Sequence, residues 1–132
     1  MKRIVLALVI VGFGISSSNA QVRTYTSSAE DSMACLQNLS LYIEFFKQKN
    51  YDDAIRGWRK AAVICPKTSE SIWANGIKIY QNLIKLEEDK AKKATLIDTL
   101  FWAYDQRIVH FPAKTGYVLG RKGTDLMKYK KS

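Results

Sequence analysis

The sequence has few of the residues that most often build catalytic or metal sites. It contains one histidine, His110, and two cysteines, Cys35 and Cys65, which lack the C-x-x-C spacing of redox-active pairs and the ligand-pair spacing of zinc sites. His110 stands beside Phe111 and Pro112 at an expected helix end, which favours packing or capping over proton transfer. The sequence therefore indicates no catalytic residue, no bound metal and no cofactor.

Long hydrophobic runs are also missing, since a membrane-spanning helix needs about 20 apolar residues. The longest run, residues 4–15, has twelve. It follows the cationic Lys2 and Arg3 and precedes small residues that end at Ala20, a pattern typical of a secretory signal peptide. We expect residues 1–20 to be cleaved before Gln21, leaving a periplasmic or secreted protein. An uncleaved N-terminal anchor is the alternative.

Acidic residues are outnumbered by basic ones. The 21 Lys and Arg against 12 Asp and Glu give a formal net charge of +9, or +7 without Lys2 and Arg3. The expected partners of a basic exported protein are acidic proteins, anionic lipids or glycans. Nucleic acid is not an expected partner, because export separates the protein from it. Clusters of lysine occur only at residues 90–93 and 128–131, and most others are expected on solvated helix faces.

Signals for β-strands are absent from the sequence. No segment alternates apolar and polar residues at length, and no Asn-Gly or Asp-Gly pair marks a hairpin. After a polar lead-in at residues 21–31, apolar residues recur at helical spacing from Ser32 onward. We predict an all-α domain over residues 32–132, with helices at 35–49 and 52–64, a third ending near Leu86, and a fourth ending near His110.

Local sequence signals indicate where these helices begin and break. Asp52 or Asp53 is suited to cap the second helix, and Thr68 or Ser69 the third. Gly57 inside the second helix marks a position of close packing, because glycine is otherwise unfavourable there. Residues 87–90 interrupt the apolar pattern, which predicts a turn; one longer continuous helix is the alternative.

The segment Cys35–Pro66 carries a spaced set of apolar and small residues: Leu41, Phe45, Tyr51, Ala54, Trp58, Ala61 and Pro66. This set resembles a tetratricopeptide (TPR) repeat, a helix–turn–helix of 34 residues in which small residues allow close helix packing. In such a repeat Trp58 would fill the space between neighbouring units. Asn38 and Tyr42 depart from the motif, at the places of its tryptophan and its glycine.

The spacing extends beyond the first unit. Gly76 lies 34 residues after Tyr42, and Leu119 and Gly120 follow Pro112 at a related interval. Units are therefore expected near 35–68 and 69–112, with a partial unit at 113–132, giving a TPR-like array of about two and a half units. The chain is similar to the N-terminal part of longer exported TPR proteins of Bacteroidetes-type bacteria. An ordinary helical bundle is the alternative.

The resemblance implies a non-enzymatic scaffold of the cell envelope that binds a protein or peptide on its concave face. The side chains it would place there are Leu36, Leu39, Ile43, Phe46, Tyr117 and Arg121. Contacts with acidic groups are expected from Arg56, Arg59, Arg121 and Lys122. Because stacked repeats need neighbours, self-association is a further expectation. The rival hypothesis is a small structural or oligomerising bundle that contacts the membrane surface through its basic C-terminus.

The two cysteines lie at related places in the first helix pair. If residues 35–49 and 52–64 pack as antiparallel helices, both thiols lie at the open end of one hairpin. In an exported chain this arrangement predicts a structural disulfide between Cys35 and Cys65. Two buried free thiols that pack as small apolar groups are the alternative.

Overall fold

The computed structural model describes residues 29–130, so the predicted signal peptide and most of the lead-in lie outside the described residues. The elements are α1 (Ala29–Lys47), α2 (Tyr51–Ile64), α3 (Glu70–Leu86), α4 (Lys90–His110), the short 3-10 helix η1 (Pro112–Lys114) and α5 (Thr115–Tyr129). No strand occurs in this part of the chain. The predicted all-α fold is confirmed.

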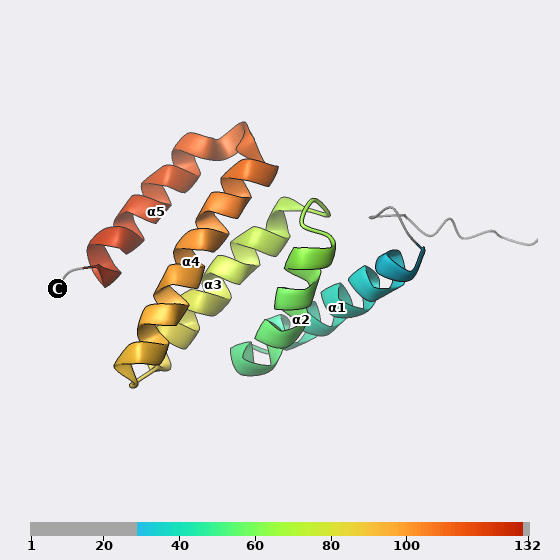
Figure 1. Cartoon of the computed structure of the whole chain (residues 1–132), viewed down its shortest axis with the longest axis horizontal. Coiled ribbons are helices and arrows are strands. Elements are labelled where there is room, and N and C mark those ends of the chain that lie inside the picture. Colours follow the sequence, from blue (N-terminus) through green and yellow to red (C-terminus); the bar gives the residue numbers. More distant parts are fainter. Residues whose placement is uncertain (1–28, 131–132) are drawn as a thin grey trace, which may run out of the picture.

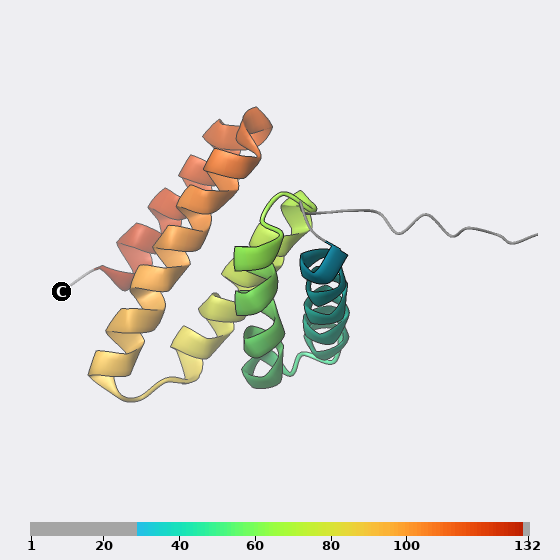
Figure 2. The same cartoon turned by 45° about the vertical axis from the view of Figure 1, so that its right-hand side comes forward.

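The helices form two antiparallel hairpins and one additional helix. α1 pairs with α2, the longer α3 and α4 form the second hairpin, and α5 packs beside α4 (Figure 1). α2 and α4 lie in front of α1 and α3 in Figure 1, and Figure 2 shows the two hairpins side by side. The predicted turn is confirmed, because α3 ends at Leu86 and α4 begins at Lys90.

The bounds of α1 differ from the predicted ones at both ends. α1 begins at Ala29, inside the expected lead-in, and ends at Lys47 instead of residue 49. Lys49 has a φ of 58°, a left-handed conformation that cannot continue a right-handed helix. The backbone N–H of Asn50 then bonds the carbonyl of Phe45 at 2.9 Å, which closes the helix end.

The caps of α2 and α3 also differ from those predicted. Asn50 caps α2, and its side-chain oxygen accepts a hydrogen bond from the backbone N–H of Asp53 at 3.4 Å. Asp52 and Asp53 lie inside the first turn, where negative charge favours the helix dipole. Ser69 precedes α3 without a side-chain capping bond, and the Thr68 hydroxyl donates instead to the carbonyl at the end of α2.

Trp58 lies between the first hairpin and α3. It is 1% exposed, and its indole N–H donates to the carbonyl oxygen of Ile72 at 2.6 Å. The rings of Trp73 and Tyr80 meet it edge-on, with centroids 5.9 and 5.5 Å away. Gly76 faces the same ring, and a Cβ added there would overlap it. Trp58 therefore fills the space between the hairpins, and Gly76 makes room for it.

The crossing of α1 and α2 is close despite the large side chain of Tyr42, which is buried. A Cβ added at Gly57 would lie 2.9 Å from the carbonyl oxygen of Asn38 and 3.0 Å from the amide nitrogen of Tyr42. The small residue that allows the approach is therefore on α2, opposite the position where the repeat motif has glycine. The predicted close packing at Gly57 is confirmed.

The predicted pairing of the two cysteines is confirmed at the level of geometry. Cys35 and Cys65 lie at disulfide distance, with Cα atoms 5.9 Å apart, and both are buried at the open end of the first hairpin. A pair of this kind is compatible with an oxidising, exported location. Within residues 29–130, no helix is both long and apolar enough to cross a membrane.

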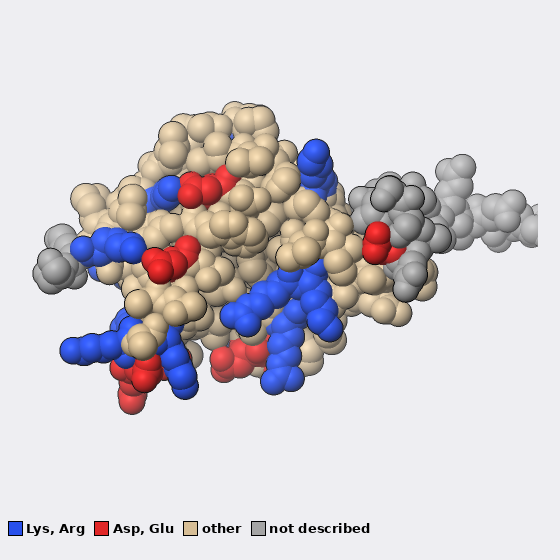
Figure 3. All heavy atoms as spheres, viewed as in Figure 1, with Lys and Arg blue, Asp and Glu red and all other residues tan. Residues whose placement is uncertain are grey.

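Charged side chains are unevenly distributed over the face seen in Figure 3. Lys and Arg side chains gather over α2, where Arg56, Arg59 and Lys60 are exposed. Over α4 and α5 basic and acidic side chains are mixed, and two ion pairs, Lys122–Asp105 and Lys130–Asp98, join these helices. Among the described residues, no ion pair involves the basic side chains of α2, which thus differ from Lys122 of α5.

Candidate functional site

A hollow of about 450 Å³ lies between α3 and α5, with α4 behind it. Its lining consists of Ala74, Ile77, Lys78, Gln81 and Asn82 from α3, Tyr104 and Arg107 from α4, and Tyr117 and Arg121 from α5. A second hollow of about 360 Å³ adjoins it along α5 and shares Tyr104, Tyr117 and Arg121. We refer to the first, larger space as the α3–α5 hollow.

Tyr117 is the most exposed aromatic side chain of this hollow, at 60%. The guanidinium carbons of Arg107 and Arg121 each lie 6.0 Å from the centroid of its ring, within the range of cation–π attraction. The ring therefore lies beside two guanidinium groups while a large part of it stays open to solvent. An exposed aromatic ring between basic side chains is the composition typical of binding hot spots.

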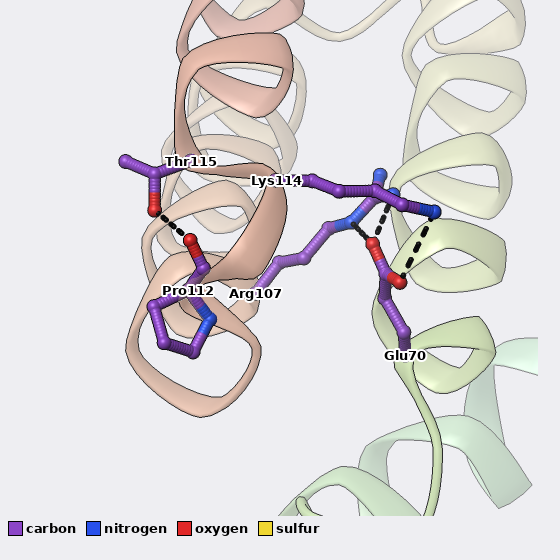
Figure 4. A network of polar contacts seen from close by, with 5 residues as sticks. All are labelled: Glu70, Arg107, Pro112, Lys114 and Thr115. Carbon is purple, nitrogen blue, oxygen red and sulfur yellow. Dashed lines mark hydrogen bonds and ion pairs between the residues drawn. The ribbon is translucent and has the colours of Figure 1, made fainter.

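Arg107 is fixed by an ion pair that joins the end of α4 to the start of α3. Its Nη2 and Nε donate to Glu70 Oε1 at 2.7 and 3.1 Å, and the Lys114 ammonium lies 3.6 Å from Glu70 Oε2 (Figure 4). The hydrogen bond from Arg107 lowers the pKa of the Glu70 carboxyl group. The pair therefore stays ionised at neutral pH and orients the guanidinium toward Tyr117.

A buried polar network adjoins the hollow: Gln81 and Tyr104 line the α3–α5 hollow, and Asp125 lines the second one. Asp125 is 7% exposed, and its Oδ2 accepts hydrogen bonds from the Tyr104 hydroxyl and from the Gln81 amide, both at 2.7 Å. Burial, together with the bond to Asp125, raises the pKa of Tyr104, so the phenol stays protonated and donating. This network connects α3, α4 and α5 and holds α5 in place beside the other two helices.

The rim of the hollow carries positive charge. The four ion pairs among the described residues involve Arg107, Lys114, Lys122 and Lys130, and none involves Lys78 or Arg121. Lys78 lies 5.7 Å from the centroid of the Phe46 ring and Arg121 lies over Tyr117. Because the buried Asp125 already receives two hydrogen bonds, the accessible charges of the hollow favour a ligand with carboxylate groups.

The predicted binding residues of α1 lie in a different place from those of α5. Leu36 is half-buried and lines a shallow depression of the α1 surface, whereas Leu39, Ile43 and Phe46 pack against the core. Tyr117 and Arg121 line the α3–α5 hollow. Lys78 lies between the two groups, because it contacts Phe46 and also lines the hollow. The six predicted residues therefore do not form one pocket.

The basic residues that were expected to act together are also separated. Arg121 lines the α3–α5 hollow, but Lys122 is paired with Asp105 on α4. Arg56 and Arg59 are exposed on α2, and Arg59 lines a different cleft, between α2 and α4. Only Arg121 of this group is thus available to a ligand in the hollow.

Sequence reasoning missed four polar residues of the hollow: Lys78, Gln81, Asn82 and Arg107. A signal for three of them exists, since Lys78, Gln81 and Asn82 follow one another at helical spacing through an otherwise apolar helix. Arg107 has no comparable signal. Its position depends on Glu70, which is 37 residues away in the sequence.

His110 packs against an aromatic ring, as its position beside Pro112 indicated. Its imidazole stacks on Trp73 with centroids 5.6 Å apart. Burial, and then the charge of Lys67, lower the pKa of His110. In the part of the chain that the structure describes, no group of three or more His, Cys, Asp or Glu side chains is placed to hold a metal ion.

Comparison with known proteins identifies no relative of this chain. No protein-family model matches the sequence, and no curated protein or solved structure is significantly similar to the chain.

Proposed function

We propose that the protein is a non-enzymatic scaffold of the cell envelope that binds a protein or peptide in the α3–α5 hollow. The helical hairpins would then be TPR-like repeats, and α5 would open a further unit. The bound segment would lie against Tyr117 and present carboxylate groups to Arg121 and Lys78.

One observation carries this proposal: an exposed tyrosine ring lies beside two guanidinium groups in an open hollow. Arg107 is oriented by Glu70, so it needs little further ordering when a ligand binds, and preorganised groups of this kind favour affinity. The combination of an aromatic ring with arginine is enriched in binding interfaces. These features support binding of polypeptide through a small set of anchors.

Export to the periplasm or the extracellular space belongs to the same proposal. Residues 1–20 have the pattern of a signal peptide, and the cysteine pair is compatible with an oxidising compartment. N-terminal sequencing of the secreted protein tests the first part, with Gln21 as the expected first residue.

Site-specific photocrosslinking in cells tests the binding site. Benzoylphenylalanine in place of Tyr117 is expected to give a discrete crosslinked protein product, which Arg121→Glu reduces. The matched control replaces Leu86, which is 73% exposed at the end of α3 and does not line the hollow. The purified partner should then bind Tyr117→Ala about tenfold or more weakly, as expected for an interface hot spot.

Two outcomes would contradict the proposal. The first is equal crosslinking from positions 117 and 86, which would show unspecific contact. The second is strong, salt-sensitive binding to vesicles that contain phosphatidylglycerol with no crosslinked protein. The second result would favour the rival hypothesis of a bundle at the membrane surface, for which the basic C-terminus is the contact.

A further inference from the structure

A separate cleft of about 340 Å³ lies between α2 and α4, outside the α3–α5 hollow. Its walls are formed by Ala62 and Val63 of α2 and by Thr99 and Trp102 of α4, and Trp58 and Tyr80 lie at its base. Trp58 and Tyr80 are almost fully buried, so the base of the cleft is rigid. We refer to this space as the α2–α4 cleft.

Two large apolar side chains of the cleft walls, Trp102 and Val63, are exposed. Trp102 packs edge-on against Trp73, with centroids 5.6 Å apart, yet 42% of its side chain is exposed. Val63 on the opposite wall is 77% exposed, and Val109, two helical turns after Trp102, is 67% exposed. Tryptophan with one face packed and the other open is a typical anchor of polypeptide interfaces.

Arg59 supplies the cleft with an ordered positive charge. Its Nε donates to the Tyr80 hydroxyl at 3.2 Å, and this bond leaves the terminal amino groups of the guanidinium for another acceptor. Those groups form the fork that binds a carboxylate with two parallel hydrogen bonds. The cleft therefore combines an apolar surface with a carboxylate-binding group at its edge.

Charges around the cleft are of one sign on the α2 side. Arg56 and Lys60 flank Arg59 and are exposed, and no ion pair among the described residues involves a cation of α2. The acidic residues of α2 lie in its first turn, at Asp52 and Asp53. On α4, Asp105 is paired with Lys122 of α5, and Asp98 with Lys130, the residue that follows α5. A basic surface beside an apolar cleft is complementary to an acidic ligand with an apolar anchor.

We infer that the α2–α4 cleft is a docking site for an acidic segment of a different protein, which inserts one bulky apolar side chain against Trp102. A carboxylate of the segment binds the terminal amino groups of Arg59, and further carboxylates lie near Arg56 and Lys60. The volume suits a single aromatic or leucine side chain with its backbone at the rim. This cleft shares α3 and α4 with the α3–α5 hollow but has no lining residue in common with it, and the inference does not rest on the proposed function.

Selection from a displayed library of random nine-residue peptides tests the inference on the purified, oxidised protein. Enriched peptides are expected to share two or more acidic residues next to Phe, Trp or Leu. A synthetic peptide of the enriched sequence should bind Trp102→Ala and Arg59→Gln each at least about tenfold more weakly than wild type. Its affinity should fall with increasing salt, because the contacts to Arg59 and its neighbours are charged.

Two controls separate loss of the site from loss of the fold and from the other site. Lys85→Gln removes an exposed positive charge that lies outside the cleft, and it should leave the peptide affinity unchanged. Tyr117→Ala damages the α3–α5 hollow and should also leave this affinity unchanged. Thermal unfolding of each variant, followed by circular dichroism, confirms that Trp102→Ala and Arg59→Gln remain folded at the assay temperature.

Three results would overturn the inference. One is an enriched pool that lacks peptides with acidic residues next to a bulky apolar residue. Binding of the protein to anionic vesicles, without enrichment of such peptides, is the same negative result. Another is unchanged binding of the enriched peptide to Trp102→Ala. The third is concentration-dependent self-association that Arg59→Gln abolishes, because a second copy of this chain would then occupy the cleft. Among the described residues, the turn after Leu86, with Glu87, Glu88 and Asp89, combines acidic side chains with an exposed leucine and is a segment that a second copy would insert.

Discussion

Replacing Gly76 by alanine should destabilise the protein, although alanine favours helices by about 1 kcal/mol over glycine. The added Cβ would overlap the ring of Trp58. That ring cannot swing aside, because it is 1% exposed and its N–H is bonded to the carbonyl of Ile72 at 2.6 Å. The backbone of α3 must therefore move away from α2.

The size of the effect follows from two opposing contributions. Overpacking a well-filled core typically costs about 1–3 kcal/mol, and an overlap with an immobile ring belongs at the upper end of that range. After the gain of about 1 kcal/mol from helix propensity, the net loss is about 2 kcal/mol. For a domain of this size, that loss lowers the melting temperature by about 10 °C.

Gly120 of α5 provides the matched control, because nothing lies within 4 Å of a Cβ added there. Gly120→Ala should raise the free energy of unfolding by about 0.5–1 kcal/mol through helix propensity alone. Urea unfolding of both variants, followed by circular dichroism, measures the two changes under the same conditions. If both substitutions stabilise the protein equally, the packing of Trp58 against α3 is wrong.

Three further predictions concern the disulfide, the buried network and pH. Reduction of Cys35–Cys65, which are 30 residues apart, should lower the free energy of unfolding by about 3.5 kcal/mol in the chain-entropy model, measured by urea unfolding with and without reductant. Equal stability in both conditions would contradict the buried bridge. Asp125→Ala should cost about 2–3 kcal/mol by leaving the Tyr104 hydroxyl without its acceptor, and hydrogen exchange should rise first in α5. Because the pKa of His110 is lowered in the folded protein, its contribution to stability is complete above its usual pKa and is lost as the pH falls below it. His110→Gln should therefore show a smaller decrease of stability between pH 7.5 and pH 5.5 than wild type, and an equal decrease would exclude this histidine as the cause.

The helical fold was largely predictable from the sequence because its pattern is local. Apolar spacing indicated the helices, Pro66 and Pro112 marked their ends, and the interruption after Leu86 marked the turn. The errors lie at caps, where competing residues are adjacent. Asn50 takes the cap that Asp52 or Asp53 was expected to take, because the left-handed conformation of Lys49 ends α1 two residues early.

The candidate site was predictable only where one helix face determines it. Tyr117 and Arg121 are four residues apart on α5, so their proximity follows from helix geometry alone. Arg107 belongs to the same hollow because it binds Glu70 across 37 residues, and no local pattern encodes that contact. The separation of Arg59 from Arg121 likewise depends on how the two hairpins pack.

Helix α3 contributes residues to both hollow spaces, so a coupling between them can be tested. Tyr80 lies at the base of the α2–α4 cleft, whereas Lys78 and Gln81 line the α3–α5 hollow. A shift of α3 caused by Gly76→Ala should therefore weaken binding at both sites. Asp125→Ala loosens only the attachment of α5 and should spare the α2–α4 cleft.

Each variant is titrated with a ligand for each site, at a temperature where both variants are folded. This experiment distinguishes weaker binding at both sites from weaker binding at the α3–α5 hollow alone. We expect Gly76→Ala to weaken both affinities and Asp125→Ala to weaken only the one at Tyr117. Equal weakening of both affinities by Asp125→Ala would show that α5 supports the cleft as well. In that case the two spaces would be parts of one binding surface, and the independence of the α2–α4 cleft from the proposed function would be refuted.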